Sequence, residues 1–450
     1  MKKNLSKITG GELMQICSDI YSSDYFFNSN IETIAKHFIS HFLDVDPFTE
    51  DFDIVYKAIS QQLVNETIQK DENEFYVYIA EEFLQLVKEP RESLLNLYNN
   101  ASKDLQSIQA NLDYLQTDKE RIEKIKKAGN LLSGKQRYRL KMIDFYRQKN
   151  ISAREEIINF LSLGIRKRAS SDSSKKRLRL RIPSIFSNKG PYNFANRFVF
   201  FGEDSYNIQH FSEASNKFLD FYIKDYKKMR DLFKNNKTAF FVQAEKYIDD
   251  KGYVSKISDL LEKSHLLNSR KKVITALINH YNNGDYISFI NMVPLQIEGI
   301  FHDYCLELGI KQSTIEISSI NEKLELINKK DSEFYHFEYY SFIFPVIRND
   351  VAHGRLIFGD KNTSIMLFLD LLHVCELVFS ESLPVNQMVN MAKKISEAIK
   401  RKTVTIVILL TGSNLLILKF HHSINLMRLA MLFCESMRKM DFGTILKINI

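Results

Sequence analysis

The amino-acid sequence predicts a mostly α-helical protein. Prolines and glycines are scarce, with 7 Pro and 15 Gly among 450 residues, so long stretches lack the residues that usually end a helix. Apolar residues recur at intervals of three and four over most of the chain, which is the spacing of one helix face. In residues 91–127 this spacing lasts for more than three heptads, interrupted only by Lys119, which is typical of a long helix packed along a narrow stripe.

Composition and charge describe a soluble globular chain. Hydrophobic residues make up 44% and charged residues 26%, the balance of a folded rather than a disordered protein. The formal net charge of +7 does not disfavour an anionic partner and indicates no more than that. The cysteines at positions 17, 305, 375 and 434 lack the paired spacing of a zinc site or a disulfide framework. No apolar segment of a signal peptide follows the charged first residues, so we expect a cytoplasmic protein. We also expect it to hold no cofactor and no metal.

The pattern changes several times along the chain and predicts six parts. We expect an N-terminal helical region (1–90), a long coiled-coil-like helical hairpin (91–165), a basic linker or ribbon (166–190), an aromatic-rich mixed region (191–256), a helical bundle (257–400) and an apolar tail (401–450). In the tail, a turn signal at 411–414 separates two apolar runs and indicates a small β-hairpin. Both runs are far shorter than the ~20 residues that span a bilayer, so we expect no membrane contact.

The predicted hairpin begins with a heptad seam after Pro90, which suits the first turn of a helix. The seam consists of Leu94, Tyr98, Ala101, Leu105, Ile108, Leu112, Leu115 and Ile122. A turn at residues 129–134 is followed by a second amphipathic stretch, so an antiparallel hairpin is the simplest structure. A coiled coil between two chains fits the same pattern.

The basic segment has two interpretations. Its cations are Lys175, Lys176, Arg177, Arg179 and Arg181. They can contact phosphates and give RNA a salt-dependent, sequence-independent affinity. Equally, a Ser-rich basic run is common in solvated linkers.

In the bundle, four helices are expected. The first runs through Leu260 to Tyr281 and stops at an Asn-Asn-Gly sequence, and the second starts at the N-cap Asp285 and kinks at Pro294. A third covers residues 334–353, where Pro345 kinks or restarts it, and a fourth covers residues 363–379. Such helices joined by short links form an all-α bundle.

The third helix carries the residues best suited to chemistry on a phosphate. Arg348 has the planar fork that holds an anion, and His353 can move a proton near neutral pH. Asn349 stands four residues before His353 and can orient its imidazole. Gly354 predicts that the helix ends just after His353, which frees that side chain. Because five helical residues correspond to about 140° of rotation, Arg348 and His353 converge only at a helix end or across a dimer axis.

Arg348, Asn349 and His353, placed late in the third helix of an all-α bundle, resemble the motif of the HEPN superfamily. The resemblance covers roughly residues 257–382, and residues 294–298 look similar to the second helix of abortive-infection-type HEPN proteins. It implies a homodimer whose two motifs face one another and cut RNA without a metal. The implied catalytic residues are Arg348, Asn349 and His353. Supporting roles are expected for Asp350, Glu298 and Arg355.

We therefore expect a metal-independent endoribonuclease, a hydrolase of RNA. By resemblance it would be a toxin or an antiviral, abortive-infection effector, restrained by its N-terminal region and triggered by a phage-derived or regulatory protein. The alternative is a non-catalytic helical module that binds RNA or protein, in which Arg348 and Asp350 form surface ion pairs and His353 caps a helix. A purely structural coiled-coil adaptor is a third interpretation.

Overall fold

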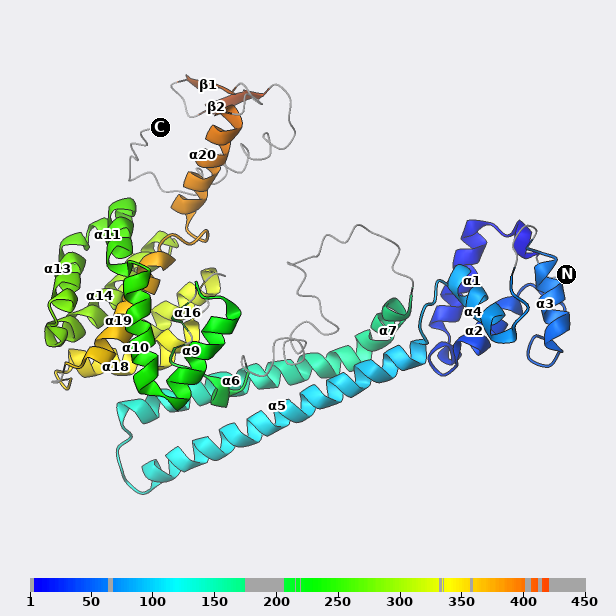
Figure 1. The fold of residues 1–450 in the computed structure, drawn as a ribbon, viewed down its shortest axis with the longest axis horizontal. Coiled ribbons are helices and arrows are strands. Elements are labelled where there is room, and N and C mark those ends of the chain that lie inside the picture. Colours follow the sequence, from blue (N-terminus) through cyan, green and yellow to red (C-terminus); the bar gives the residue numbers. More distant parts are fainter. Residues whose placement is uncertain are drawn as a thin grey trace. The chain divides into compact units, whose positions relative to one another are not determined.

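The structure of the chain is a computed structural model. It describes residues 4–63, 68–174, 206–214, 216–218, 220–331, 334, 336–356, 359–400, 406–411 and 415–420. Nearly all regular structure in these residues is α-helical, which confirms the predicted fold class (Figure 1). The chain divides into two compact units, one formed by Met1–Leu132 with Ile143–Phe211 and the other by Ser133–Met142 with Ser212–Ile450. No helix among the described residues is long and apolar enough to cross a membrane.

Short helices form the beginning of the first unit. They are η1 (Leu5–Lys7), α1 (Gly10–Ser22), η2 (Asp24–Phe27), α2 (Ile31–Ile39), α3 (Phe52–Ser60) and α4 (Glu72–Glu82). Polar side chains cap the N-termini of most of these helices. Thr9 and Glu12 form a capping box on α1, and Asn30 caps α2. Their apolar faces meet in one core around the buried Phe38 and Phe75.

Two long helices follow, α5 (Pro90–Lys127) and α6 (Gly134–Asn159). Pro90 occupies the first turn of α5, as its fixed φ and missing N–H allow. Asp144 of α6 pairs with Lys119 at 2.8 Å, and farther along α6 Asn150 bonds Asn111 at 3.3 Å. The later residue of α6 thus meets the earlier residue of α5, so the two helices of one chain run antiparallel (Figure 1).

The buried stripe of α5 differs from the predicted seam. Every seventh residue from Ala101 is apolar and buried as expected, but the alternate positions are polar. The buried residues of this stripe are Leu97, Ala101, Asp104, Ile108, Asn111, Leu115, Asp118 and Ile122. The predicted Leu94 and Leu105 are only half-buried, and Tyr98 is exposed. The apolar pattern failed because polar side chains are tolerated inside when a partner satisfies them, as Asn150 satisfies Asn111.

One π-helical turn, η3 (Phe160–Gly164), connects α6 to α7 (Ile165–Ser173). Gly164 lets the ring of Phe160 approach, since a Cβ there would lie 3.1 Å from that ring. The first unit ends with η5 (Ile208–His210). The adjacent Tyr206 is anchored on α6, because its carbonyl accepts a bond of 2.9 Å from the buried Asn150 amide.

The second unit is a bundle around two helices, α14 (Tyr286–Glu307) and α19 (Lys361–Leu377), which pack on one another. Helices α13, α16 and α18 contact α14, whereas α10 and α11 contact α19. The remaining bounds are α9 (Ile223–Asn235), α10 (Lys237–Asp250), α11 (Tyr253–Lys263), α12 (His265–Asn268), α13 (Lys271–Asn282), α15 (Gln312–Ile317), α16 (Ile320–Lys330), α17 (Phe337–Phe342), α18 (Phe344–Ala352) and α20 (Pro384–Lys400).

Helix breaks in this bundle differ from the predicted ones. The single helix expected through Leu260 to Tyr281 is divided into α11, α12 and α13, because Ser264 ends one helix and its hydroxyl caps the next. Pro345 lies in the first turn of α18 and restarts the chain after α17. Pro294 lies inside one continuous helix, α14.

In the tail, strands β1 (Ile406–Thr411) and β2 (Leu415–Phe420) pair antiparallel, with Ile406 opposite Phe420 and Thr411 opposite Leu415. This is the β-hairpin pairing that the sequence indicates. The rest of the predicted apolar tail, residues 421–450, lies outside the described residues.

Candidate functional site

The first candidate site is the C-terminal end of α18. His353 is the C-cap and Gly354 follows with φ +62°, in the left-handed region that glycine adopts without strain. Gly354 donates its N–H to Val351 at 2.9 Å, and Arg355 donates to Asp350 at 2.8 Å. These two bonds form a Schellman motif, which closes the helix. The helix therefore ends at the predicted position, and the imidazole of His353 is exposed.

Arg348 lies one turn before that end and is held on two sides. Its Nε donates to Glu298 Oε2 of α14 at 2.5 Å, and its Nη1 donates to Asn349 Oδ1 at 3.0 Å. The pair is mostly buried, with 28% of the Arg348 side chain and 17% of the Glu298 side chain exposed. Within the described part of the chain, Nη2 has no hydrogen-bond partner. Glu298 thus orients the guanidinium and leaves one of its edges able to bind an anion.

Asn349 has other partners than the one expected. Its amide nitrogen donates to the hydroxyl of Tyr138 at 3.2 Å while its oxygen accepts from Arg348. No side-chain bond joins it to His353 within the described residues, so it orients Arg348 instead of the imidazole. Asp350 faces Arg355, with 3.8 Å between carboxylate and guanidinium. Both side chains are substantially exposed, so this pair contributes little to stability.

The expected RNA-binding cations are outside the described residues; they are Lys175, Lys176, Arg177, Arg179 and Arg181. The described residues contain no group of three or more His, Cys, Asp or Glu side chains that could hold a metal ion.

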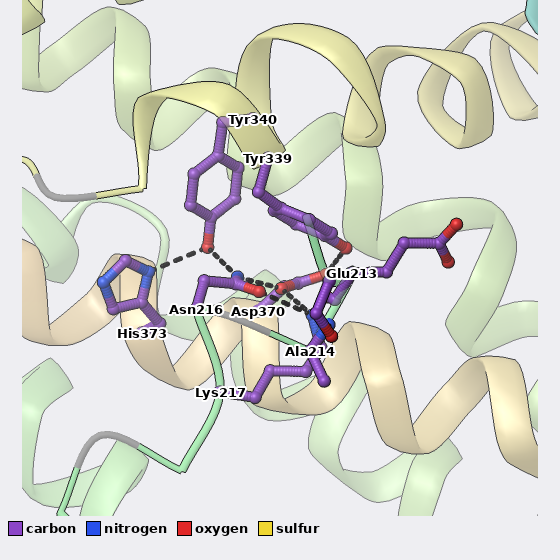
Figure 2. A network of polar contacts seen from close by, with 9 residues as sticks. Glu213, Ala214, Asn216, Lys217, Tyr339, Tyr340, Asp370 and His373 are labelled. Carbon is purple, nitrogen blue, oxygen red and sulfur yellow. Dashed lines mark hydrogen bonds and ion pairs between the residues drawn. The ribbon is translucent and has the colours of Figure 1, made fainter. Parts of the chain in front are cut away.

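A second, buried cluster lies in the same unit and joins α17, α19 and the segment before α9 (Figure 2). At its centre Lys217 and Asp370 form an ion pair of 2.7 Å with both side chains fully buried. Tyr339 donates its hydroxyl to the other Asp370 oxygen at 2.6 Å, and its ring lies 4.2 Å from the Lys217 ammonium. Asn216 joins the pair, donating to Asp370 at 2.6 Å and accepting from Lys217 at 3.0 Å.

The cluster continues to a histidine. Asn216 also donates to the hydroxyl of Tyr340 at 3.2 Å, and that hydroxyl lies 2.9 Å from His373 Nδ1. Burial lowers the pKa of His373 well below its ordinary value, so its imidazole is neutral. Burial likewise lowers the pKa of Lys217, an effect that Asp370 opposes. Beside His373, burial lowers the pKa of His336 to about 4.

This second cluster was not predicted from the sequence. Asp370 is a carboxylate inside the apolar run of α19, which is a usable signal because an unpaired charge is rarely buried. Its partner Lys217 is 153 residues away, so no local pattern identifies the pair. Tyr138, the partner of Asn349, was missed for the same reason.

Comparisons with protein-family models, with curated protein sequences and with solved structures give no match to this chain. The fold and the two clusters define it as a mostly α-helical protein with a motif at one helix end and a buried charged network.

Proposed function

We propose that this chain is a metal-independent endoribonuclease whose active site lies at the end of α18. The observation that carries the proposal is the exposed His353 at a helix terminus, one turn after an Arg348 that Glu298 and Asn349 hold in place. The resemblance of Arg348, Asn349 and His353 to the HEPN motif supports the same chemistry. A role as a toxin or anti-phage effector rests on that resemblance alone.

The reaction that fits these groups uses the nucleophile already present in RNA. The 2′-oxygen forms a bond to the adjacent phosphorus while the bond from phosphorus to the 5′-oxygen breaks. One imidazole takes the proton of the 2′-hydroxyl, and a second group gives a proton to the departing 5′-oxygen. The products are a 2′,3′-cyclic phosphate and a 5′-hydroxyl. Arg348 stabilises the charge that grows on the phosphoryl oxygens.

One copy of the chain offers a single His353 for two proton transfers. A homodimer with two α18 ends facing each other supplies the second imidazole. In this arrangement the free edge of Arg348 binds the phosphate, and its Nε stays on Glu298. We therefore include a homodimer in the proposal.

The test is incubation of the purified chain with single-stranded RNA in EDTA. Cleavage should persist in the chelator, yield 2′,3′-cyclic phosphate ends, and fall at least a hundredfold in His353→Ala, because general acid–base catalysis contributes about 10²–10⁴-fold. Arg348→Lys keeps a positive charge but loses the planar fork, and should also impair cleavage. His265→Ala removes an exposed histidine of α12 and is the matched control, expected to retain activity.

Intact RNA with salt-sensitive binding would contradict the proposal and favour the non-catalytic binding module. The exposed lysines of α9 make that alternative concrete, since Lys224, Lys227 and Lys228 line one open depression of 440 Å³. If the chain neither binds nor cleaves RNA, the structural coiled-coil adaptor remains as the interpretation.

A further inference from the structure

The buried cluster of Figure 2 borders a pocket of about 220 Å³. Aromatic side chains form much of its wall: Phe218, Tyr247 of α10 and Tyr253 of α11. The rings of Phe218 and Tyr247 lie 4.9 Å apart and those of Tyr247 and Tyr253 lie 5.0 Å apart, in edge-to-face contacts. The volume is smaller than the roughly 300–1,000 Å³ of sites for drug-sized ligands. It suits one planar ring system.

The backbone of this wall is strained. Phe218 has φ +62°, a conformation that a bulky side chain rarely adopts. Such residues are retained where surrounding contacts over-determine them, and they are frequent at ligand-binding sites. Asn216 and Lys217, immediately before Phe218, are held by Asp370. The buried ion pair thereby keeps Phe218 against the pocket.

Hydrogen-bond chemistry determines which groups the pocket offers. Lys217 can only donate and the Asp370 carboxylate accepts, so the Asn216 oxygen must face Lys217 and its nitrogen must face Asp370. The same nitrogen donates to Tyr340, so the Tyr340 hydroxyl gives its own hydrogen to His373 Nδ1. The neutral imidazole of His373 then carries its proton on Nε2. His373, whose tautomer the network selects, is one of the residues that line the pocket.

Glu376 supplies the complementary group. It lies one turn after His373 on α19, on the same helix face, and lines the same pocket. Its Oε1 pairs with Lys256 of α11. Neither Glu376 Oε2 nor His373 Nε2 has a hydrogen-bond partner in the part of the chain that the structure describes. The described residues therefore leave His373 Nε2–H as a donor and Glu376 Oε2 as an acceptor without a bonding partner.

The charges around the pocket are already paired. Lys256 pairs with Glu376, Lys251 pairs with Asp220 at 2.9 Å, and Lys217 pairs with Asp370. No lining cation is left over for a phosphate among the described residues. The pocket therefore favours an uncharged planar molecule with a donor and an acceptor on one edge.

We propose that this pocket binds a nucleobase, stacked on its aromatic wall, with His373 Nε2–H donating to a base acceptor and Glu376 accepting from a base N–H. Nucleobases combine a flat π-face with neighbouring donors and acceptors on one edge, and proteins read them by stacking and edge hydrogen bonds. The base can come from a free nucleoside or from single-stranded RNA. This inference does not depend on the ribonuclease proposal, because it uses none of the α18 residues.

Calorimetric titration of the full-length chain with the four ribonucleosides tests it. At least one of the four should bind, because each base presents an acceptor beside an N–H; where adenosine or uridine binds, its methylated form should bind at least tenfold more weakly. N6,N6-dimethyladenosine and 3-methyluridine serve here because they keep the ring but lose the N–H that faces Glu376. Inorganic phosphate and ribose 5-phosphate should not compete, and His353→Ala should bind nucleoside like the unmodified chain.

Two matched variants separate recognition from folding. Glu376→Met and Lys256→Met both break the same ion pair, but only the first removes the acceptor. We expect at least a tenfold weaker nucleoside affinity in Glu376→Met and less than a threefold change in Lys256→Met, with unchanged circular dichroism in both. Absence of nucleoside binding, equal binding of the methylated forms, or equal losses in the two variants would overturn the proposal.

Competition identifies the source of the base. If the pocket takes a base of RNA, the nucleoside displaces labelled single-stranded RNA and Glu376→Met weakens RNA binding. If the pocket takes a free nucleoside, neither added nucleoside nor the Glu376→Met substitution changes RNA binding.

Discussion

Two neighbouring histidines make the stability of the second unit depend on pH. The rings of His336 and His373 lie 4.9 Å apart, and both have a lowered pKa because burial disfavours the charged imidazole. Nε2 of His336 is buried, and no described residue bonds it. A proton on this ring would enter a site with no partner and with the Lys217 ammonium nearby.

This arrangement predicts acid sensitivity above the usual range of carboxylate titration. The pKa of His336 is lowered from 6.5 to about 4. Between pH 6.5 and 4, His336 is therefore protonated in the unfolded chain and neutral in the folded chain. The free energy of unfolding should therefore fall as pH drops from 6.5 to 4, by about 3 kcal/mol from this residue. Urea titrations at several pH values measure the slope.

The comparison variant is His336→Phe, which keeps a ring and removes the titration. It should show a shallower fall over the same interval, whatever its stability at neutral pH. An unchanged slope would mean that His336 does not set this dependence.

Among the elements, the end of α18 is the one on which the proposed activity depends. Its Schellman closure requires a left-handed residue after His353, and Gly354 provides it at φ +62°. A Cβ at Gly354 would meet nothing within 4 Å. Any effect of adding one is therefore due to backbone strain and not to a clash.

Gly354→Ala should lower the free energy of unfolding by about 1–2 kcal/mol, the cost of a left-handed conformation for an L-residue. RNA cleavage should fall as well, because relief of that strain moves His353. Gly134→Ala, at the start of α6, is the matched control: it also meets nothing within 4 Å but lacks a positive φ. It should be neutral or slightly stabilising. Equal effects in both variants would contradict the assigned role of Gly354.

At the scale of the molecule, the sequence predicts the features that depend on neighbouring residues. Pro90 starts α5, Asp285 caps α14 and Gly354 ends α18. Each does so through a local backbone preference that the sequence alone predicts. The fold class follows from such signals added together. The position of the Arg348 motif at a helix end was predictable for this reason.

Features that depend on distant partners were not predictable. Asp104, Asn111 and Asp118 are buried on α5, where the apolar pattern places the seam one position away. Only the presence of Asn150 on α6 makes a buried Asn111 acceptable. Lys217 and Asp370 follow the same logic, since either charge alone would be excluded from a core.

The two polar pairs also lie in different units, and this gives a prediction for the whole chain. Asn111 and Asn150 belong to the first unit, and Lys217 and Asp370 to the second. Each unit has its own buried core. A chain with two cores need not unfold as one cooperative step.

We therefore expect two transitions in thermal or urea unfolding of the full chain. Lys217→Met leaves Asp370 buried and unpaired, which should cost about 3–5 kcal/mol and shift only one transition. Asn111→Leu leaves the Asn150 oxygen unsatisfied, which should cost about 1–3 kcal/mol and shift only the other. The double variant should show both shifts unchanged, because mutations without shared partners add. Calorimetry of the four proteins measures this, and Lys224→Met, an exposed residue of α9, should move neither transition. If both substitutions shift one common transition, the two cores unfold together and the cooperative unit is the entire chain.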